Sequence, residues 1–236
     1  MVQDSFKTRR RISYNDLRKS RNSPRIMGQE ILRYESELYG WQTADSISAH
    51  EYILPKVINM LPEGKFTIMD IGCGNGYIAG KLAAMGHNVI GVDSAKDGIT
   101  IARKAHPNVR FYCRSAYDDL MEICHSVDIV LASEVIEHLF WPKLFLTHVH
   151  KVLQKGGYII LTTPYHGYLK NLAISMFNFW DKHHTSDWEG GHIKFFSEKL
   201  LKRILQHSGF NEIKFNNAGR VIYLWKSIVC RGRKSE

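Results

Sequence analysis

The chain has 236 residues, 44% of them hydrophobic, and its 32 Lys and Arg residues outnumber 23 Asp and Glu to give a formal net charge of +9. This length supports one folded domain with a substantial core. No apolar run reaches the roughly 20 residues that span a bilayer, and the amino terminus lacks the apolar core of a secretion signal, so we expect a cytoplasmic protein. The cysteines, whose spacing predicts neither a disulfide framework nor a thiolate zinc site, are Cys73, Cys113, Cys124 and Cys230.

The excess positive charge lies at the two ends. Residues 1–25 contain eight Lys or Arg against two acids, residues 226–236 contain four against one, and the body between them is neutral. We interpret the ends either as solvated tails or as segments that contact RNA or an anionic membrane surface. The expected organisation is a basic, mobile arm at 1–25, a catalytic domain at 26–229 and a basic tail at 230–236.

The predicted elements alternate after two preliminary helices within 26–62. Apolar spacing predicts one helix from Ile26 and another from about Ser46 to Met60. Strands are expected at 66–71, 88–92, 109–113, 127–132, 157–163, 211–217 and 220–229, and helices at 77–85, 97–105, 118–124, 143–154 and 197–208. This alternation predicts an α/β, Rossmann-like, doubly wound sheet with helices on both faces.

The stretch from Phe66 to Gly76 joins an apolar strand to a helix through three alternating glycines, Gly72, Gly74 and Gly76. Glycines permit a tight turn and close approach of the backbone to a ligand. The free N–H groups at the start of the following helix favour a negative ligand group. The pattern is close to the dinucleotide fingerprint, except that its third glycine comes one residue early.

Two acids identify the ligand of this turn. Asp70 comes just before the glycines, where it would repel a pyrophosphate but suits an ammonium group beside a carboxylate. Asp93 ends the next predicted strand, where an acid accepts hydrogen bonds from ribose hydroxyls. S-adenosylmethionine (SAM) has an amino-acid end, a ribose and no phosphate, so the sequence predicts a SAM site.

The chain resembles the class I SAM-dependent methyltransferases over roughly residues 45–225. The segments that carry the resemblance are Asp70–Gly76, Val92–Asp93, Ala132–His138 and Leu153–Pro164. The resemblance implies a seven-stranded sheet with an antiparallel last hairpin, and SAM as the donor that becomes S-adenosylhomocysteine (SAH). It also implies that the adenine meets Ser115 and Ala116, where relatives often carry an acid, with Asp118 as the substitute. Cys73, Ser94 and Ser133 complete the expected cofactor-binding set.

A group of acids and histidines follows the fourth strand of the domain. On a helical turn, Glu134, Glu137 and His138 share one face, and His192 lies in a later loop expected at the same edge. Two carboxylates and an imidazole suit a divalent ion. The segment is similar to those of the ubiquinone-biosynthesis O-methyltransferases and the small-RNA 2′-O-methyltransferases, which implies that these four residues hold an ion such as Mg²⁺ against an acceptor hydroxyl.

Two other interpretations of this group stay open. His138 could act as a general base without a metal, since its ordinary pKa near 6.5 suits proton removal at neutral pH. Glu134 would then face the methionine end of SAM as the second catalytic residue. Alternatively, the group has only a structural role.

An insert at 165–195 is expected to shape the acceptor pocket. Its apolar stripe at helical spacing predicts packing onto the sheet, a lid over the pocket, or contact with a membrane or lipid-like substrate through 168–180. His183 and His184 are weaker candidates for the pocket lining. The stripe consists of Leu169, Leu172, Ala173, Met176, Phe177 and Trp180.

The sequence therefore predicts a SAM-dependent methyltransferase that acts on a hydroxyl of a small aromatic or lipid-linked acceptor. The alternatives are an RNA 2′-O-methyltransferase, whose basic tails would hold phosphates, and a non-catalytic SAM-binding protein. Peripheral membrane contact is compatible with the first.

Overall fold

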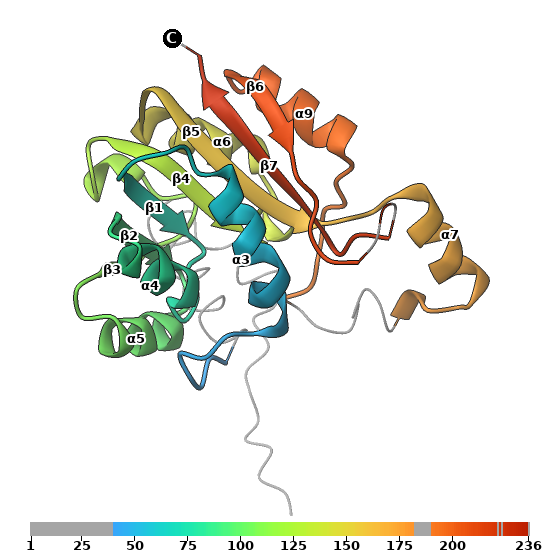
Figure 1. Ribbon diagram of the computed structural model, residues 1–236, viewed down its shortest axis with the longest axis horizontal. Coiled ribbons are helices and arrows are strands. Elements are labelled where there is room, and N and C mark those ends of the chain that lie inside the picture. Colours follow the sequence, from blue (N-terminus) through green and yellow to red (C-terminus); the bar gives the residue numbers. More distant parts are fainter. Residues whose placement is uncertain (1–39, 182–189, 221, 223, 236) are drawn as a thin grey trace, which may run out of the picture.

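The computed structural model describes residues 40–181, 190–220, 222 and 224–235 (Figure 1). Seven strands form one sheet in the order β3-β2-β1-β4-β5-β7-β6. β1 to β5 pair in parallel, whereas β7 is antiparallel to both of its neighbours. The strands are β1 (Thr67–Ile71), β2 (Asn88–Asp93), β3 (Arg110–Cys113), β4 (Val127–Ser133), β5 (Leu153–Pro164), β6 (Phe210–Phe215) and β7 (Ser227–Lys234). The predicted Rossmann-like sheet with an antiparallel last hairpin is confirmed.

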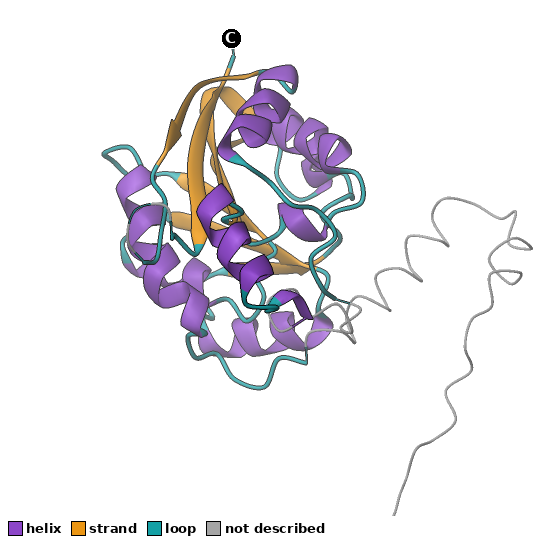
Figure 2. Ribbon diagram, turned by 90° about the vertical axis from the view of Figure 1, so that its right-hand side faces the viewer, coloured by secondary structure: helices purple, strands orange, loops and turns teal. Residues whose placement is uncertain are grey.

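Helices cover both faces of the sheet (Figure 2). α3 (Ser48–Met60), α4 (Tyr77–Ala84) and α5 (Lys96–Ala105) pack on one face. α6 (Pro142–Val152) and α9 (Glu198–His207) pack on the other. A short α7 (Tyr168–Met176) extends from the end of β5, and single 3₁₀ turns follow β3 and β4 at Leu120–Glu122 and Ile136–His138.

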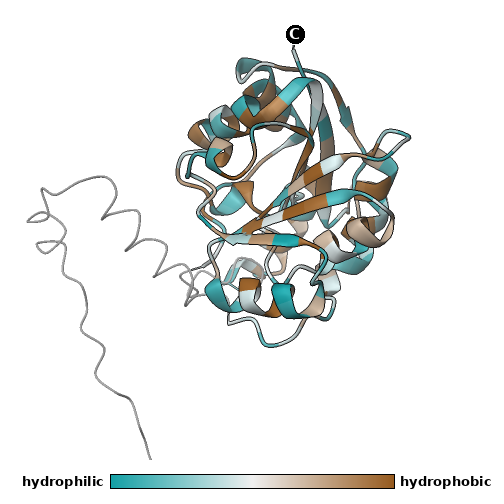
Figure 3. Ribbon diagram, turned by 90° about the vertical axis from the view of Figure 1, so that its left-hand side faces the viewer, coloured by the Kyte–Doolittle hydropathy of each residue, from teal (hydrophilic) through white to brown (hydrophobic). Residues whose placement is uncertain are grey.

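The sequence produces two cores because successive strand residues point to opposite faces. Ile68 and Ile129 belong to the core under α3, α4 and α5, while their neighbours Met69 and Val130 belong to the core under α6 and α9. All four are fully buried, and each contributes roughly 1.5–3 kcal/mol to folding. Hydrophobic positions accordingly run along the strands inside the molecule (Figure 3).

The predicted boundaries between α6 and β5, the last parallel strand, were wrong. α6 ends at Val152, and β5 begins at Leu153 rather than at 157. The register with β4 shifts between Val127 and Ile129, and Gly156 has a left-handed φ of 72°. The sheet thus accommodates Gly156 as an irregularity within the strand.

The expected basic tail at 230–236 is also wrong, because residues up to Lys234 belong to β7. The strand occupies Ser227–Lys234 instead of 220–229, since the prediction followed the apolar residues before Lys226 and excluded the basic ones after it.

All four cations of this end have partners within the fold. Lys226 Nζ lies 4.6 Å from the centroid of the Tyr52 ring. Arg231 donates to the Met60 carbonyl at 2.7 Å, and Arg233 pairs with Glu212 at 2.9 Å. Lys234 Nζ donates to the His150 and Leu153 carbonyls at 2.6 and 2.7 Å, where it satisfies the C-terminus of α6. These contacts connect β7 and its start to neighbouring elements, and the fold accounts for the positive charge.

The apolar stripe of the insert does not pack onto the sheet. α7 ends at Met176, and Ile174, from the opposite side of the helix, is its buried residue. Among the stripe residues, Met176 is 71% exposed and Phe177 is 64% exposed. α7 stands away from the sheet in Figure 1. The expected packing is therefore wrong, and the lid and membrane interpretations remain predictions.

Several predictions fall outside the described residues: the arm at 1–25, the first preliminary helix, and His183 and His184. The second preliminary helix is confirmed as α3. Among the helices that the structure describes, none has the length and apolar character needed to cross a membrane.

Candidate functional site

The three glycines form the predicted turn between β1 and α4. Gly72, Gly74 and Gly76 all have positive φ, at 72°, 51° and 80°, a region that costs residues with a side chain. The Gly72 and Cys73 N–H groups donate to the Val92 carbonyl at 2.7 and 3.1 Å, which ties the turn to the end of β2. The turn therefore lies at the carboxyl edge of the parallel strands, where doubly wound folds bind ligands.

Asp70 lies beneath this turn with only 1% of its surface exposed. Burial, and secondly the charge of Asp93, raises the pKa of Asp70 to about 8. Its Oδ2 is buried and has no hydrogen-bond partner among the described residues. A buried acceptor without a partner is costly, and an ammonium group placed here would satisfy it.

Asp93 connects the glycine turn to the loop that follows β2. Its Oδ2 accepts a hydrogen bond from Gly74 N–H and its Oδ1 accepts one from Ala95 N–H, both at 2.7 Å. Burial raises the pKa of Asp93, and these two backbone donors oppose that shift. Each carboxylate oxygen retains a second lone pair, so the side chain can still accept from a diol.

The expected adenine residues form a separate turn after β3. Ser115 N–H donates to Asp118 Oδ2 at 3.0 Å, and Tyr117 N–H donates to Ser115 Oγ at 3.2 Å. Ser115 and its substitute Asp118 are thus partners in one turn, beside Ala116. Of the other expected residues, Cys73 is buried with a raised pKa, Ser94 follows β2, and Ser133 Oγ lies 3.2 Å from Thr162 Oγ1.

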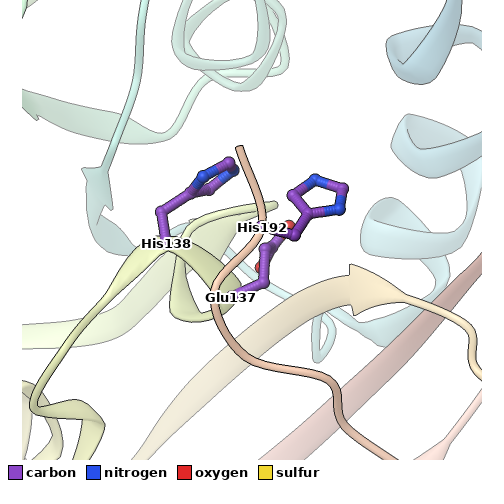
Figure 4. A group of neighbouring side chains, drawn as sticks. All are labelled: Glu137, His138 and His192. Carbon is purple, nitrogen blue, oxygen red and sulfur yellow. The ribbon is translucent and has the colours of Figure 1, made fainter. Parts of the chain in front are cut away.

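Three of the four expected metal ligands converge. Single ligand atoms of Glu137, His138 and His192 all lie within 4.8 Å of one another. The two imidazole rings come from different segments of the chain and are 5.0 Å apart between centroids (Figure 4).

Backbone hydrogen bonds bring these segments together. Ile193 and Lys194 N–H donate to the Glu137 carbonyl at 3.0 and 2.9 Å, and His138 Nδ1 lies 3.3 Å from the Gly191 carbonyl oxygen. The 3₁₀ turn after β4 and the loop before α9 are thereby fixed to each other.

Glu134 is not a member of this group. The prediction assumed one helical turn from Glu134 to His138, but only Ile136–His138 is helical, and Glu134 has a φ of 54°. The Glu134 carboxylate instead accepts from Thr162 Oγ1 at 2.8 Å, while Glu134 N–H donates to the same hydroxyl at 2.9 Å. The structure therefore separates the two carboxylates of the predicted ligand set.

Burial dominates the electrostatics of both acids. It raises the pKa of Glu134 to about 7, although the hydroxyls of Thr162 and Ser227 and the charge of Lys170 oppose the shift. Burial, and then the charge of Glu134, raises the pKa of Glu137 well above its ordinary value. Glu137 is 0% exposed, and neither of its carboxylate oxygens has a partner within the described part of the chain.

Burial lowers the pKa of His138, although the Gly191 and Gly190 carbonyls oppose the shift. The resulting arrangement has one buried carboxylate and two imidazoles whose ligand atoms lie close together. This donor set fits a divalent cation, and histidine-rich sets favour first-row transition metals or Zn²⁺ over Mg²⁺, which prefers oxygen ligands.

Sequence reasoning missed several residues near the site. Thr162, at the end of β5, holds Glu134, and Tyr52 of α3 has its pKa raised by burial and by the charge of Glu134. Lys170 donates to the Tyr165 carbonyl at 2.8 Å. Trp41 lies against the glycine turn. Thr162 could have been suspected from its place in the Leu153–Pro164 segment, but no pattern in the sequence marks the other three.

The comparison with family models identifies a methyltransferase domain at residues 37–214. Among curated proteins, the chain is 33% identical over 115 residues to the ubiquinone biosynthesis O-methyltransferase of Hydrogenovibrio crunogenus, a match that covers 47% of each chain. It is 28% identical over 173 residues to the protein of that name from Ruegeria sp., covering 70% of this chain and 68% of the relative. The matched part of this chain therefore spans about half to two thirds of the length of these two relatives.

Solved structures agree on the fold. The chain superposes on magnesium protoporphyrin IX methyltransferase from Synechocystis PCC 6803, solved with bound SAH, with a TM-score of 0.63 and 15% identity over 94% of this chain and all of the other. The predicted resemblance to the ubiquinone-biosynthesis group is confirmed by the curated relatives. With a family model that matches most of the chain and a sheet of the corresponding order, this protein belongs to the class I SAM-dependent methyltransferase family.

Proposed function

We propose that this protein transfers the methyl group of SAM to a hydroxyl of a small aromatic or lipid-linked acceptor, assisted by a divalent metal ion. The observation that carries the proposal is the convergence of Glu137, His138 and His192 at the same sheet edge as the glycine turn. The names of the curated relatives support a hydroxyl as the acceptor group.

The cofactor end of the site would hold SAM through charge and hydrogen bonds. The unpartnered Oδ2 of Asp70 suits the ammonium group, and the oxygens of Asp93 suit the two ribose hydroxyls. The Gly74 position would bring the backbone close to the ribose, and Ser115 with Ala116 would border the adenine.

Glu137, His138 and His192 would hold the metal ion. When bound, such an ion lowers the pKa of a coordinated hydroxyl and fixes its oxygen. The buried Glu137 carboxylate supplies the negative charge that a cation requires in a dry environment.

The reaction forms one O–C bond and breaks the S–C bond of SAM. The acceptor hydroxyl loses its proton, its oxygen attacks the methyl carbon, and the sulfonium sulfur keeps the bonding electron pair as neutral SAH. The proton requires an acceptor close to the oxygen. Glu134, which Thr162 holds after the end of β4, is the candidate for that role.

The exposed apolar residues of α7 support a hydrophobic acceptor. They lie on the segment that follows β5 directly, at the carboxyl edge. An acceptor with an apolar tail could cover this stripe while its hydroxyl reached the acid and histidine group. An RNA acceptor receives less support, because the C-terminal cations contact the fold itself.

The test is turnover of labelled SAM with a catechol that carries a short or a long alkyl tail. After treatment with a chelator, activity should fall, and Mn²⁺, Co²⁺ or Zn²⁺ should restore it better than Mg²⁺. Glu137→Gln and His192→Ala should abolish this metal response, whereas His125→Ala, at an exposed loop position, should keep it. Full activity in the presence of chelator would contradict the metal, and methylation of RNA but not of any catechol would contradict the acceptor.

A further inference from the structure

A short segment before α3 crosses the glycine turn. Residues 40–47, here called the strap, have no regular secondary structure and are mostly exposed. The strap is nevertheless held by specific hydrogen bonds. The buried Asn75, inside the glycine turn, donates through Nδ2 to the Thr43 and Asp45 carbonyls, each at 2.9 Å. One side chain of the turn therefore fixes two points of the strap.

The strap makes a further bond to the loop after β2. Trp41 N–H donates to Asp97 Oδ2 at 2.7 Å, in the first turn of α5. It thus joins the two loops that lead from β1 and β2, the same loops that carry Gly74 and Asp93. Trp41 and Asp97 are 56 positions apart in the sequence, so only the fold brings them together.

The Trp41 indole lies against the glycine turn and against the first turn of α5. A Cβ atom at position 74 would be 2.5 Å from Trp41 Cζ2, and one at position 98 would be 2.9 Å from Trp41 Cδ1. These distances are too short for a side chain, so the glycines at 74 and 98 leave the space that the indole occupies. The ring, which is partly exposed, sits across the junction of the turn and α5.

This placement couples Trp41 to Asp93. The Gly74 residue that the indole contacts is the residue whose N–H donates to Asp93 Oδ2. A shift of Gly74 would therefore move the donor that orients this carboxylate. Since Asp93 is the acid proposed for the ribose, the indole is placed to set the geometry of the nucleoside end.

We propose that Trp41 is a positioning residue for the nucleoside end of SAM, and that the strap forms the outer wall of that end. The inference rests on the proposed use of SAM as donor. The indole holds the glycine turn against α5, and Asp97 and Asn75 hold the indole's segment in place. Methionine binding, at the Asp70 end, does not depend on it.

The test is calorimetric titration of the full chain with SAH. Trp41→Ala should raise the Kd about tenfold, which corresponds to about 1.4 kcal/mol, and Asp97→Ala should raise it in the same sense. Trp41→Phe keeps a flat ring and should retain most of the affinity. Gln42→Ala, an exposed position of the same strap, is the matched control and should bind as the wild type does.

A second measurement separates positioning from a loss of folding. Adenosine and methionine are used as competitors against SAH, and Trp41→Ala should weaken competition by adenosine but not by methionine. Equal weakening of both fragments, or unchanged SAH affinity in Trp41→Ala, would overturn the inference. If Trp41→Ala does not fold, the same competition by adenosine and methionine is measured with Asp97→Ala, and Trp41→Phe serves as the reference. Weaker competition by adenosine alone in Asp97→Ala would then support the inference. Failure of the wild type to bind SAH would instead overturn the proposed donor.

Discussion

The two halves of the carboxyl edge are built differently. The half proposed for the cofactor is made of neighbouring elements, β1, the glycine turn and β2, and its Asp93 is held by the backbone N–H groups of Gly74 and Ala95. The acceptor half brings together Glu137, from the end of β4, and His192, from a loop more than fifty residues later. A local motif defines the first half, while long-range packing assembles the second.

This difference has a chemical counterpart. Donor binding needs a fixed shape for one invariant molecule, which a glycine turn with left-handed backbone provides. Acceptor binding and proton removal need buried titratable groups, which only burial and mutual proximity can perturb. The two halves should therefore respond separately to substitution.

The largest expected effect breaks the cofactor half alone. Asp93→Ala removes the acceptor proposed for both ribose hydroxyls and should raise the Kd for SAM by about a hundredfold, the size of two lost hydrogen bonds to a charged group. Calorimetry measures the Kd, and Glu63→Ala, an exposed acid outside the site, is the control. Unchanged affinity in Asp93→Ala would remove the ribose role.

The second effect breaks the acceptor half alone. His192→Ala should lower kcat by about ten- to a hundredfold and leave the Kd for SAM within about twofold, because the imidazole belongs to the group proposed to hold the metal and not to the turn. Single-turnover assays with labelled SAM give kcat, and calorimetry gives the Kd. A parallel loss of SAM affinity would show that the two halves are not independent.

A pH series sharpens the comparison through Asp70. Its pKa of about 8 lies above the value of 3.8 for a free aspartate, so the folded protein without SAM binds this proton more tightly than the unfolded chain does. The resulting contribution to stability is complete below about pH 4 and is lost as the pH rises to about 8.

SAM binding should have the opposite trend, because the ammonium group pairs with the ionised carboxylate. The Kd should fall about fivefold as the pH rises from 7 to 8, because the ionised fraction of a group with a pKa of about 8 rises from about a tenth to about a half. Asp70→Asn should remove this dependence, measured by titrations at several pH values. A wild-type Kd that does not change with pH would place the ammonium group elsewhere.

The smallest effect concerns α7. Met176→Ser should change the free energy of unfolding by less than about 0.5 kcal/mol, because the side chain is exposed. Ile174→Ala, on the buried side of the helix, should cost about 2 kcal/mol or more. Chemical denaturation measures both.

Activity distinguishes the roles left to the stripe. If it receives an apolar tail, Met176→Ser should raise KM for a long-tailed catechol and leave KM for a short one unchanged. If Met176→Ser leaves KM for the long-tailed catechol unchanged as well, α7 does not contact the tail.

The order of elements and the cofactor turn follow from the sequence, because both depend on local rules. Alternating strands and helices specify a parallel sheet, and the glycines at 72, 74 and 76 permit the turn wherever the chain lies. The antiparallel last hairpin was implied by the family resemblance. The predicted position of β7 was wrong. Arg231 and Arg233 belong to this strand, and their partners Met60 and Glu212 come close only in the folded protein.

Tertiary structure decided the rest of the site. It placed His192 beside Glu137, gave Glu134 to Thr162 and laid Trp41 across the glycine turn. Spacing along a helix could not predict these contacts, since the helical turn after β4 is only Ile136–His138. The sequence by itself determined the glycine turn and the two acids proposed to hold the donor, because a backbone conformation and neighbouring residues encode them. The group proposed for the acceptor depends on burial and on pairs distant in the sequence, which arise only when the chain has folded.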